Sequence, residues 1–417
     1  MLANAPFRRL WLAQAISVFG DYLAMFAVQA LIVFRLHGSA SQVSAVLLVS
    51  LLPAVAIGPF AGVLADRWDP RRTMIASDVS RAALLLLLAL VPTHQESSAL
   101  VELCAICFAI GCVSAFFVPA QGVMIPALVD RTELLAASAA MQQTWQWARI
   151  ASPGVAAALI ARFSEDACFV ADAASFVISA LLVAAISHKI PRVNTPRSSG
   201  ERPTARILRD IRAGATCLFK STELSSATLA MAAGTFATGC FSSLAGVYVR
   251  DVLHAGMPVY SMLGSLIAAG MLAGSLFVGA MARRAPREAS REKMIASGMA
   301  LIGLCIFMLA AFPSMFTALV GAAGIGLGAS GALVTANAVL REHTPADLRG
   351  RVVSVCVAMM SAAQAAAILF AGNGAARIGV RGVFALAAAM LLAQPAYRYF
   401  RRGTTRSVPA ACFQSPR

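Results

Sequence analysis

Three ionisable residues stand inside long apolar runs of the sequence, where a charge is expensive and is usually kept for a function. Asp21 and Arg149 each lie about midway along such a run, and Asp172 lies nearer the beginning of another. A carboxyl group at mid-membrane depth can bind and release a proton, and a guanidinium group there can hold a carboxylate or an anionic substrate. These side chains are therefore the first candidates for chemistry inside a membrane.

Two roles stay open for the pair of Asp21 and Arg149. In the first, Asp21 takes up and releases a proton, while Arg149 adjusts its proton affinity or binds an anionic substrate. In the second, the two side chains form a fixed polar clamp between helices, because pairing lowers the cost of burying each charge. Asp172 is expected to be structural, because it lies close in sequence to Ser175 and Ser179.

A charged segment follows the second long apolar run. From Gly62 it reads Gly-Val-Leu-Ala-Asp-Arg-Trp-Asp-Pro-Arg-Arg, so that Asp66 is followed by Arg67, Arg71 and Arg72. A charged hinge between two spanning helices suits a membrane protein whose helices move relative to one another. Asp66 ends a span, where its charge suits the N-terminus of a helix from another part of the chain.

The elements that must position these residues are membrane-spanning helices. Of the 417 residues, 59% are hydrophobic and 13% are charged, with a mean hydropathy of +0.76, whereas a soluble domain is about half apolar and about a quarter charged. The first run is too long for a signal peptide and is interpreted as a span. We expect an all-α integral membrane protein with twelve transmembrane helices in two six-helix halves. The predicted spans are 10–34, 42–65, 73–92, 99–126, 134–161, 167–187, 224–248, 258–281, 293–312, 315–340, 352–375 and 379–399.

The distribution of lysine and arginine predicts the orientation. If the N-terminus is inside, 28 basic residues fall in cytoplasmic segments and five in outer segments, which is a strong positive-inside signal. Both termini are then cytoplasmic, and the protein is a multi-pass protein of the bacterial inner (plasma) membrane. The net charge of +15 follows from this topology, so no nucleic-acid partner is expected.

The longest polar segment, 189–222, predicts a cytoplasmic linker between two bundles, 1–188 and 223–402. Its second part, 205–219, has an apolar face opposite several arginines and is predicted to be an amphipathic helix on the inner membrane surface. The alternative is a solvated basic linker attracted to anionic lipid. The tail, 403–417, is polar and is expected to be disordered.

Several function classes are disfavoured by what the sequence lacks. There is no G-x-x-x-x-G-K-[ST] phosphate loop, so this chain is not expected to bind ATP as its energy source. The five histidines lie in loops or at span ends, so neither a metal site nor a cofactor is expected. No Ser-His-Asp set falls at one depth, and an enzyme is not expected. Because the second half has no mid-membrane charge, coupling is expected in the first half.

The segment from Gly62 to Arg72 continues into Ala76-Ser-Asp78-Val-Ser-Arg81. Together these residues resemble the signature loop of the major facilitator superfamily, closest to the subgroup that holds the enterobactin exporter and the macrolide efflux pumps. The resemblance covers nearly the whole chain and includes Pro345-Ala-Asp-Leu-Arg-Gly-Arg as a second-half inner loop. It implies a cytoplasmic gate formed by Gly62, Asp66, Arg67, Arg71, Arg72, Asp78 and Arg81, with Asp347, Arg349 and Arg351 in the second-half loop.

Two departures from the family pattern affect the expected coupling. The fourth span of the family often carries an arginine used in proton coupling, and Gln121 stands at that position. The fifth-span antiporter pattern Gly-Pro-x-x-Gly-Gly is replaced around Ser152, Pro153 and Gly154, whose small size still suits close helix packing. The second-half copy of the signature, Gly279 with Arg283 and Arg284, lacks its acid, so the first-half signature loop is expected to carry most of the inner gating.

Topology and resemblance together predict a secondary active transporter that works by alternating access. The expected activity is proton-coupled efflux of a drug-like organic compound or a siderophore, by a monomer in the lipid bilayer. The alternatives are an importer or facilitator of a small metabolite, and a membrane sensor or scaffold that has lost transport. The candidates for proton coupling or substrate binding are Asp21, Arg149, Gln121 and Asp172.

Overall fold

The structure is a computed structural model that describes residues 4–57, 61, 68–90, 96–130, 132–186, 203–284, 288–345 and 348–404. Within these residues the chain forms helices and no strand. The first half contains α1 (Ala5–Ala30), the π-helical turn η1 (Leu31–Arg35), α2 (Ala40–Ala56), α4 (Pro70–Ala89), α5 (Glu96–Leu128), α6 (Leu134–Arg162) and α7 (Glu165–Ala184). The rest contains α8 (Pro203–Lys220), α9 (Thr222–Asp251), α10 (Met257–Arg284), α11 (Glu288–Ala311), α12 (Met315–His343) and α13 (Arg349–Thr404).

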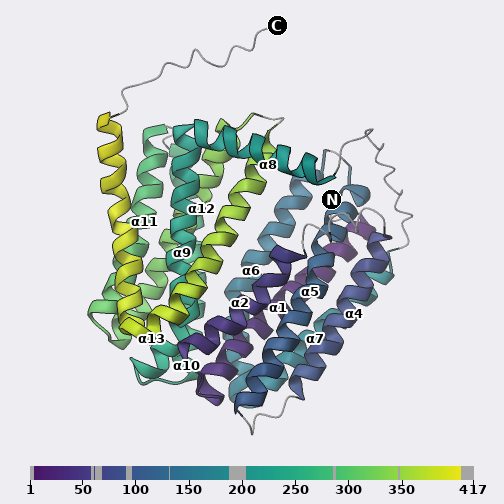
Figure 1. Cartoon of the computed structure of the whole chain (residues 1–417). Helices are drawn as coiled ribbons and strands as arrows, with labels where there is room; N and C mark the ends of the chain where they lie inside the picture. Colours follow the sequence, from purple (N-terminus) through teal and green to yellow (C-terminus); the bar gives the residue numbers. More distant parts are fainter. Residues whose placement is uncertain are drawn as a thin grey trace.

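The helices form two groups that lie side by side (Figure 1). The first group holds α1, α2 and α4 to α7, and the second holds α9 to α13. α13 is two helical arms that meet at Gly379, whose φ of 73° and ψ of 167° interrupt the helix. With the arms counted separately and α8 set aside, the described residues form the twelve helical segments that the sequence predicts.

Helix ends follow local signals in the sequence. The tightest predicted break, Phe312-Pro-Ser, separates α11 from α12, and Ser314 caps α12 through a reciprocal pair of hydrogen bonds with Thr317. α4 begins with Asp69 as its N-cap and Pro70 in its first turn. Eight helical segments of the described chain are long and apolar enough to cross a membrane, and α4 is not among them.

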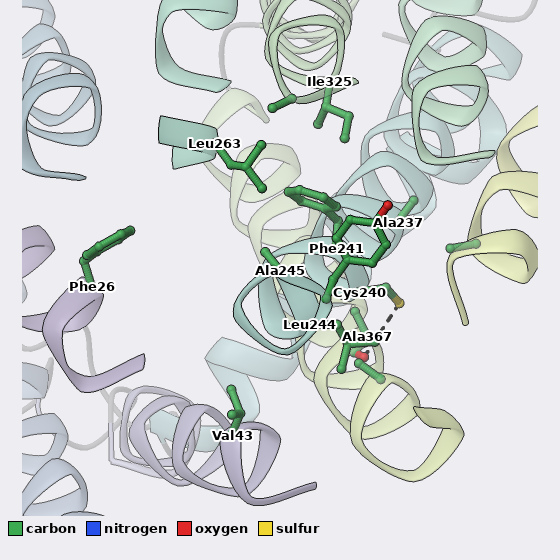
Figure 2. Packing of buried hydrophobic residues seen from close by; sticks show 14 of the residues in the cluster. Phe26, Val43, Ala237, Cys240, Phe241, Leu244, Ala245, Leu263, Ile325 and Ala367 are labelled. Carbon is green, nitrogen blue, oxygen red and sulfur yellow. Dashed lines mark hydrogen bonds between the residues drawn. The ribbon is translucent and has the colours of Figure 1, made fainter. Parts of the chain in front are cut away.

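The packed interior of the second half is built around α9. Figure 2 shows Cys240, Phe241 and Leu244 of α9 beside Ala367 of α13, and the Cys240 thiol donates to the Ala367 carbonyl at 3.7 Å. All four side chains are buried. The cysteine therefore serves as a small packing residue.

The amphipathic helix predicted at 205–219 is present as α8, which crosses one end of the second group of helices (Figure 1). We refer to this end of the molecule as the α8 end. The backbone of α8 packs closely on the start of α13, because a Cβ atom at Gly214 would stand 2.6 Å from the carbonyl oxygen of Arg351. Leu218 of α8 is fully buried. α8 is therefore docked on the second half by one of its faces.

Candidate functional site: a charge cluster beside a central cavity

A buried ion pair lies inside the first half, about midway along α4. The Arg81 guanidinium donates to Asp78 at 2.5 Å, and the hydroxyl of Ser179 on α7 donates to the other Asp78 oxygen at 2.7 Å. Asp78 is 0% exposed and Arg81 is 4% exposed. A charge this deep is tolerated only when it is paired and hydrogen-bonded, so Asp78 and Arg81 fix each other.

The Arg81 guanidinium is also held between two aromatic rings. It lies 4.6 Å from the centre of the Phe117 ring and 4.0 Å from that of Phe176, which is cation–π geometry. Its Nη1 atom is 3.9 Å from the Asp21 carboxylate of α1. Its Nε atom has no hydrogen-bond partner within the described part of the chain, so the guanidinium retains an unused donor beside these acids.

Asp172 of α7 completes the group. It is 2% exposed, accepts a hydrogen bond from Ser175 at 2.9 Å, and interacts electrostatically with both Asp21 and Arg81. Its carboxylate lies against the backbone of Gly20, where a Cβ atom would stand 2.0 Å from the Asp172 oxygen. Glycine at this position therefore lets α1 approach α7 closely enough to place Asp21 and Asp172 together.

We call Asp21, Asp78, Arg81 and Asp172 the charge cluster. Asp21 and Asp172 also line a cavity of about 720 Å³ that extends between the two halves. Most of its wall is apolar, and the polar side chains of Gln29, Ser50 and Ser242 reach it. Asp21 differs from its neighbours because 39% of its side chain is exposed. It is thus the member of the cluster with the best access to the cavity.

Arg149 lies on α6 and reaches a second cavity, of about 370 Å³, whose other lining residues come from the second half. Ser242 and Gln364 line both cavities, so the two spaces adjoin. Arg149 is exposed, and it acts electrostatically on Tyr22 of α1. The two cavities together therefore present carboxylates on one side and a guanidinium on the other.

The structure gives Asp21 a different partner from the expected one. Its neighbouring cation is Arg81 and not Arg149, because α1 and α4 both pack against α7 in the first half. Asp172 does bond to Ser175, as its sequence neighbourhood suggests, but it also belongs to the cluster. Asp78 and Arg81 were expected at the cytoplasmic gate, yet they lie in the protein interior. The signal that places them there is Asp69-Pro70, which starts α4 before the predicted span at 73.

The other gate candidates divide into two sets. Gly62, Asp66 and Arg67 lie outside the described residues. Arg71 donates hydrogen bonds to the carbonyls of Val183, at 3.2 Å, and Ala184, and so caps the C-terminus of α7. Arg72 lines a surface cavity near the start of α4.

The remaining candidates lie away from the charge cluster. Gln121 is half-buried on α5. Ser152 donates to the Phe19 carbonyl at 3.1 Å and joins α6 to α1. Pro153 and Gly154 face Gly264 and Ser265 of α10, so this segment packs the two halves together.

The second-half loop is described only in part. Asp347 lies outside the described residues. Arg349 begins α13. Arg351 follows in the same helix, and its carbonyl oxygen meets α8 at Gly214.

Sequence reasoning gave no role to Arg250, which joins the halves at the end opposite α8. It donates to the carbonyls of Val33 at 2.8 Å and Gly38 at 2.9 Å, and its own position is held by Asp251 at 2.5 Å. Nearby, the Tyr260 hydroxyl bonds to Gln29 at 3.1 Å. Arg250 and Tyr260 therefore join the two halves at this end.

Replacing Arg250 with alanine is expected to open the end opposite α8. Both carbonyl contacts are charge-assisted, and each such bond contributes about 1.5–3 kcal/mol net of exchange with water. In a cysteine-free background, labelling of a single cysteine at Val33, whose buried side chain meets Gly246 of the other half, should therefore rise several-fold in Arg250→Ala. Arg162→Ala, another exposed arginine at this end, is the control and should leave labelling unchanged. Equal labelling of Arg250→Ala and the parent would contradict a closing role.

Comparison with known proteins agrees with this architecture. The chain is 27% identical over 404 residues to the uncharacterized MFS-type transporter YfiS of Bacillus subtilis, covering 91% of this chain and 89% of that protein. It is 26% identical over 393 residues to macrolide efflux protein A of Streptococcus pyogenes, covering 93% of each chain.

Solved structures share the fold at low sequence identity. The nucleoside transporter NupG superposes with a TM-score of 0.72 at 12% identity, covering 95% of this chain and 99% of that one. A bacterial homologue of the human lysosomal transporter Spinster also gives 0.72, at 13% identity, covering 97% and 98%. The family model of the Major Facilitator Superfamily matches residues 10–291 and 227–411. Two six-helix groups around a central cavity, together with this match, establish that the chain belongs to the Major Facilitator Superfamily and is a transmembrane transporter.

Proposed function

We propose that this transporter exports an organic compound from the cytoplasm of a bacterium in exchange for protons. The observation that carries the proposal is the charge cluster, in which three carboxylates surround one guanidinium beside a cavity between the halves. Export is supported by the relatives named macrolide efflux protein A. The organic nature of the substrate is supported by a cavity wall that is mostly apolar.

Charge balance supports proton binding at the cluster. With all three acids ionised, Asp21, Asp78 and Asp172 would outnumber the single cation by two charges. Uncompensated charge in an apolar interior costs several kcal/mol, so such a group neutralises itself by taking up protons. Asp78 is committed to Arg81 and Ser179, which leaves Asp21 and Asp172 as the exchanging pair.

The arrangement of the halves supports loading from the cytoplasm. The hydrogen bonds of Arg250 and Tyr260 join the halves at the end opposite α8. The positive-inside rule assigns the α8 end, near which the basic linker lies, to the cytoplasm. A cavity closed toward the outside is ready to receive a cytoplasmic compound. Asp21 would release its proton to the cytoplasm as the compound loads, and a proton taken up from the outside, after the compound has left, would favour the return to the cytoplasm-facing state.

Arg149 is proposed to orient the substrate. It reaches a cavity lined otherwise by the second half, and it forms no ion pair with an acid of the described residues. A carbonyl, phosphate or carboxylate oxygen of a bound compound can accept its hydrogen bonds. Substrate at Arg149 and a proton at Asp21 would thus occupy adjoining parts of one space.

Asp21→Asn is expected to remove the drive from a pH gradient while downhill movement persists. Asparagine fills the same volume but cannot exchange a proton. Inside-out membrane vesicles with an imposed pH gradient should accumulate the macrolide erythromycin through the parent protein, and at least tenfold less through Asp21→Asn, because coupling is lost and not merely weakened. Counterflow of preloaded erythromycin should remain within about twofold of the parent, since binding is conserved.

Glu102→Gln is the matched control, because Glu102 is an exposed acid in the spanning helix α5. It should accumulate erythromycin like the parent. Gradient-driven accumulation by Asp21→Asn at the parental level would refute coupling at this residue. Accumulation in right-side-out vesicles only would instead favour an importer.

A further inference from the structure

A cavity of about 430 Å³ lies between α8 and the connection from α12 to α13. Three basic side chains line it, and no acidic side chain is among its lining residues in the described chain. The lining residues are Arg209, Arg212, Ala213, Thr216, Cys217, Lys220, Pro345 and Leu348. Several cations around one cavity match the oxygen atoms of a phosphate group.

The spacing along α8 places cations beside apolar side chains. Arg212, Thr216 and Lys220 recur every four residues and so share one stripe of the helix. Ile211 and Phe219 stand on the neighbouring stripe, and they are 53% and 56% exposed. A helix with basic and exposed apolar stripes side by side is suited to the boundary between lipid headgroups and acyl chains.

The opposite face of α8 holds the helix in this orientation. Leu218 is fully buried. Gly214 meets the Arg351 carbonyl so closely that a Cβ atom would stand 2.6 Å from it. Because α8 is packed in this way, the basic stripe is preformed, and binding need not order a flexible segment.

We propose that the cavity beside α8 binds the phosphate of an anionic phospholipid. Arg212 and Lys220 are its principal ligands, and Arg209 borders the same space. The acyl chains lie along Ile211 and Phe219. The exposed apolar stripe favours a lipid over a soluble phosphate, which would leave those side chains in water. This site is independent of the charge cluster and of the transport direction.

The test measures lipid binding to the purified full-length protein by native mass spectrometry. Parent protein in a neutral detergent is titrated with phosphatidylglycerol or phosphatidylcholine, and it should retain phosphatidylglycerol selectively. In the double variant Arg212→Gln/Lys220→Gln, the affinity for phosphatidylglycerol should fall by about tenfold or more, as expected for two cations close to an anionic headgroup. Arg162→Gln/Arg377→Gln removes the same charge from exposed positions at the opposite end and should bind like the parent.

Three outcomes would overturn the proposal. The first is an equal loss in the two double variants, which would mean a general effect of net charge. The second is parental binding by Arg212→Gln/Lys220→Gln. The third is displacement of the lipid by equimolar glycerol 3-phosphate, which would assign the cavity to a soluble phosphate. Melting curves of both variants establish that they are folded before lipid is added.

Discussion

Arg81→Leu is expected to produce the largest loss of stability among single substitutions in the first half. The substitution leaves the Asp78 carboxylate fully buried with only the Ser179 hydroxyl as a described partner. Breaking a buried ion pair by removing one partner costs about 3–5 kcal/mol. Leucine also loses the contacts of the guanidinium with the rings of Phe117 and Phe176. Thermal unfolding of the detergent-purified protein should show a much lower midpoint, and transport should be absent.

The double variant Asp78→Asn/Arg81→Leu separates charge from packing. It removes both members of the pair, so the fully buried Asp78 charge is not left without its cation, and it should be more stable than Arg81→Leu alone. Transport should stay absent in both, because Asp21 has lost its cation. If Arg81→Leu melts at the parental temperature, the ion pair is not what holds α4 to the rest of the cluster. If the double variant is no more stable than the single one, the loss is one of packing.

Most of the helix boundaries could be predicted from the sequence, because the signals that set them are local. Proline, serine and charged residues interrupt the apolar runs, and capping at Asp69 and Ser314 involves residues three positions apart. The break at Gly379 falls where the last two predicted spans meet. Local chemistry of this kind does not depend on which helices become neighbours.

The composition of the charge cluster could be predicted only in part. An acid in an apolar run, such as Asp21, is visible in the sequence because its burial is costly. Its partner is not visible, because pairing depends on α1, α4 and α7 packing together. Arg81 lies close to a motif rich in arginine, and that motif drew the interpretation toward the membrane surface. The buried position of Arg81 could have been predicted from Asp69 and Pro70. They start α4 before the predicted span and so place Arg81 further along the helix, inside the protein.

The packing role of the glycines in α12 could likewise be predicted only in part. A glycine-rich span predicts close approach to a neighbour, but the sequence does not say which helix approaches or at which glycine. The structure assigns different glycines to different neighbours. Gly326 faces α10, whereas Gly324 and Gly328 face α11. Gly331 has only ordinary contact with Val278, at 3.8 Å.

Gly326→Ala is the substitution in the second half for which we expect the largest loss of stability. A Cβ atom at Gly326 would stand 1.9 Å from the carbonyl oxygen of Ile267, and one at Gly270 would stand 2.1 Å from that of Ala323. The obstacle in each case is backbone, which cannot rotate away as a side chain can. α10 and α12 would have to separate, at a cost of about 1–3 kcal/mol or more. The gain in helix propensity from glycine to alanine is at most about 1 kcal/mol, so the net effect is destabilising.

Gly331→Ala provides a matched control on the same helix. The added methyl group meets only Val278 at ordinary contact distance, so helix propensity should dominate and the melting midpoint should stay the same or rise. In Gly326→Ala the midpoint should fall. Because Ile267 of α10 and Ile325 of α12 line the second cavity, erythromycin counterflow should weaken together with stability in that variant alone. Equal midpoints for the two variants would mean that α10 and α12 tolerate separation, and that their close approach does not set the shape of the substrate cavity.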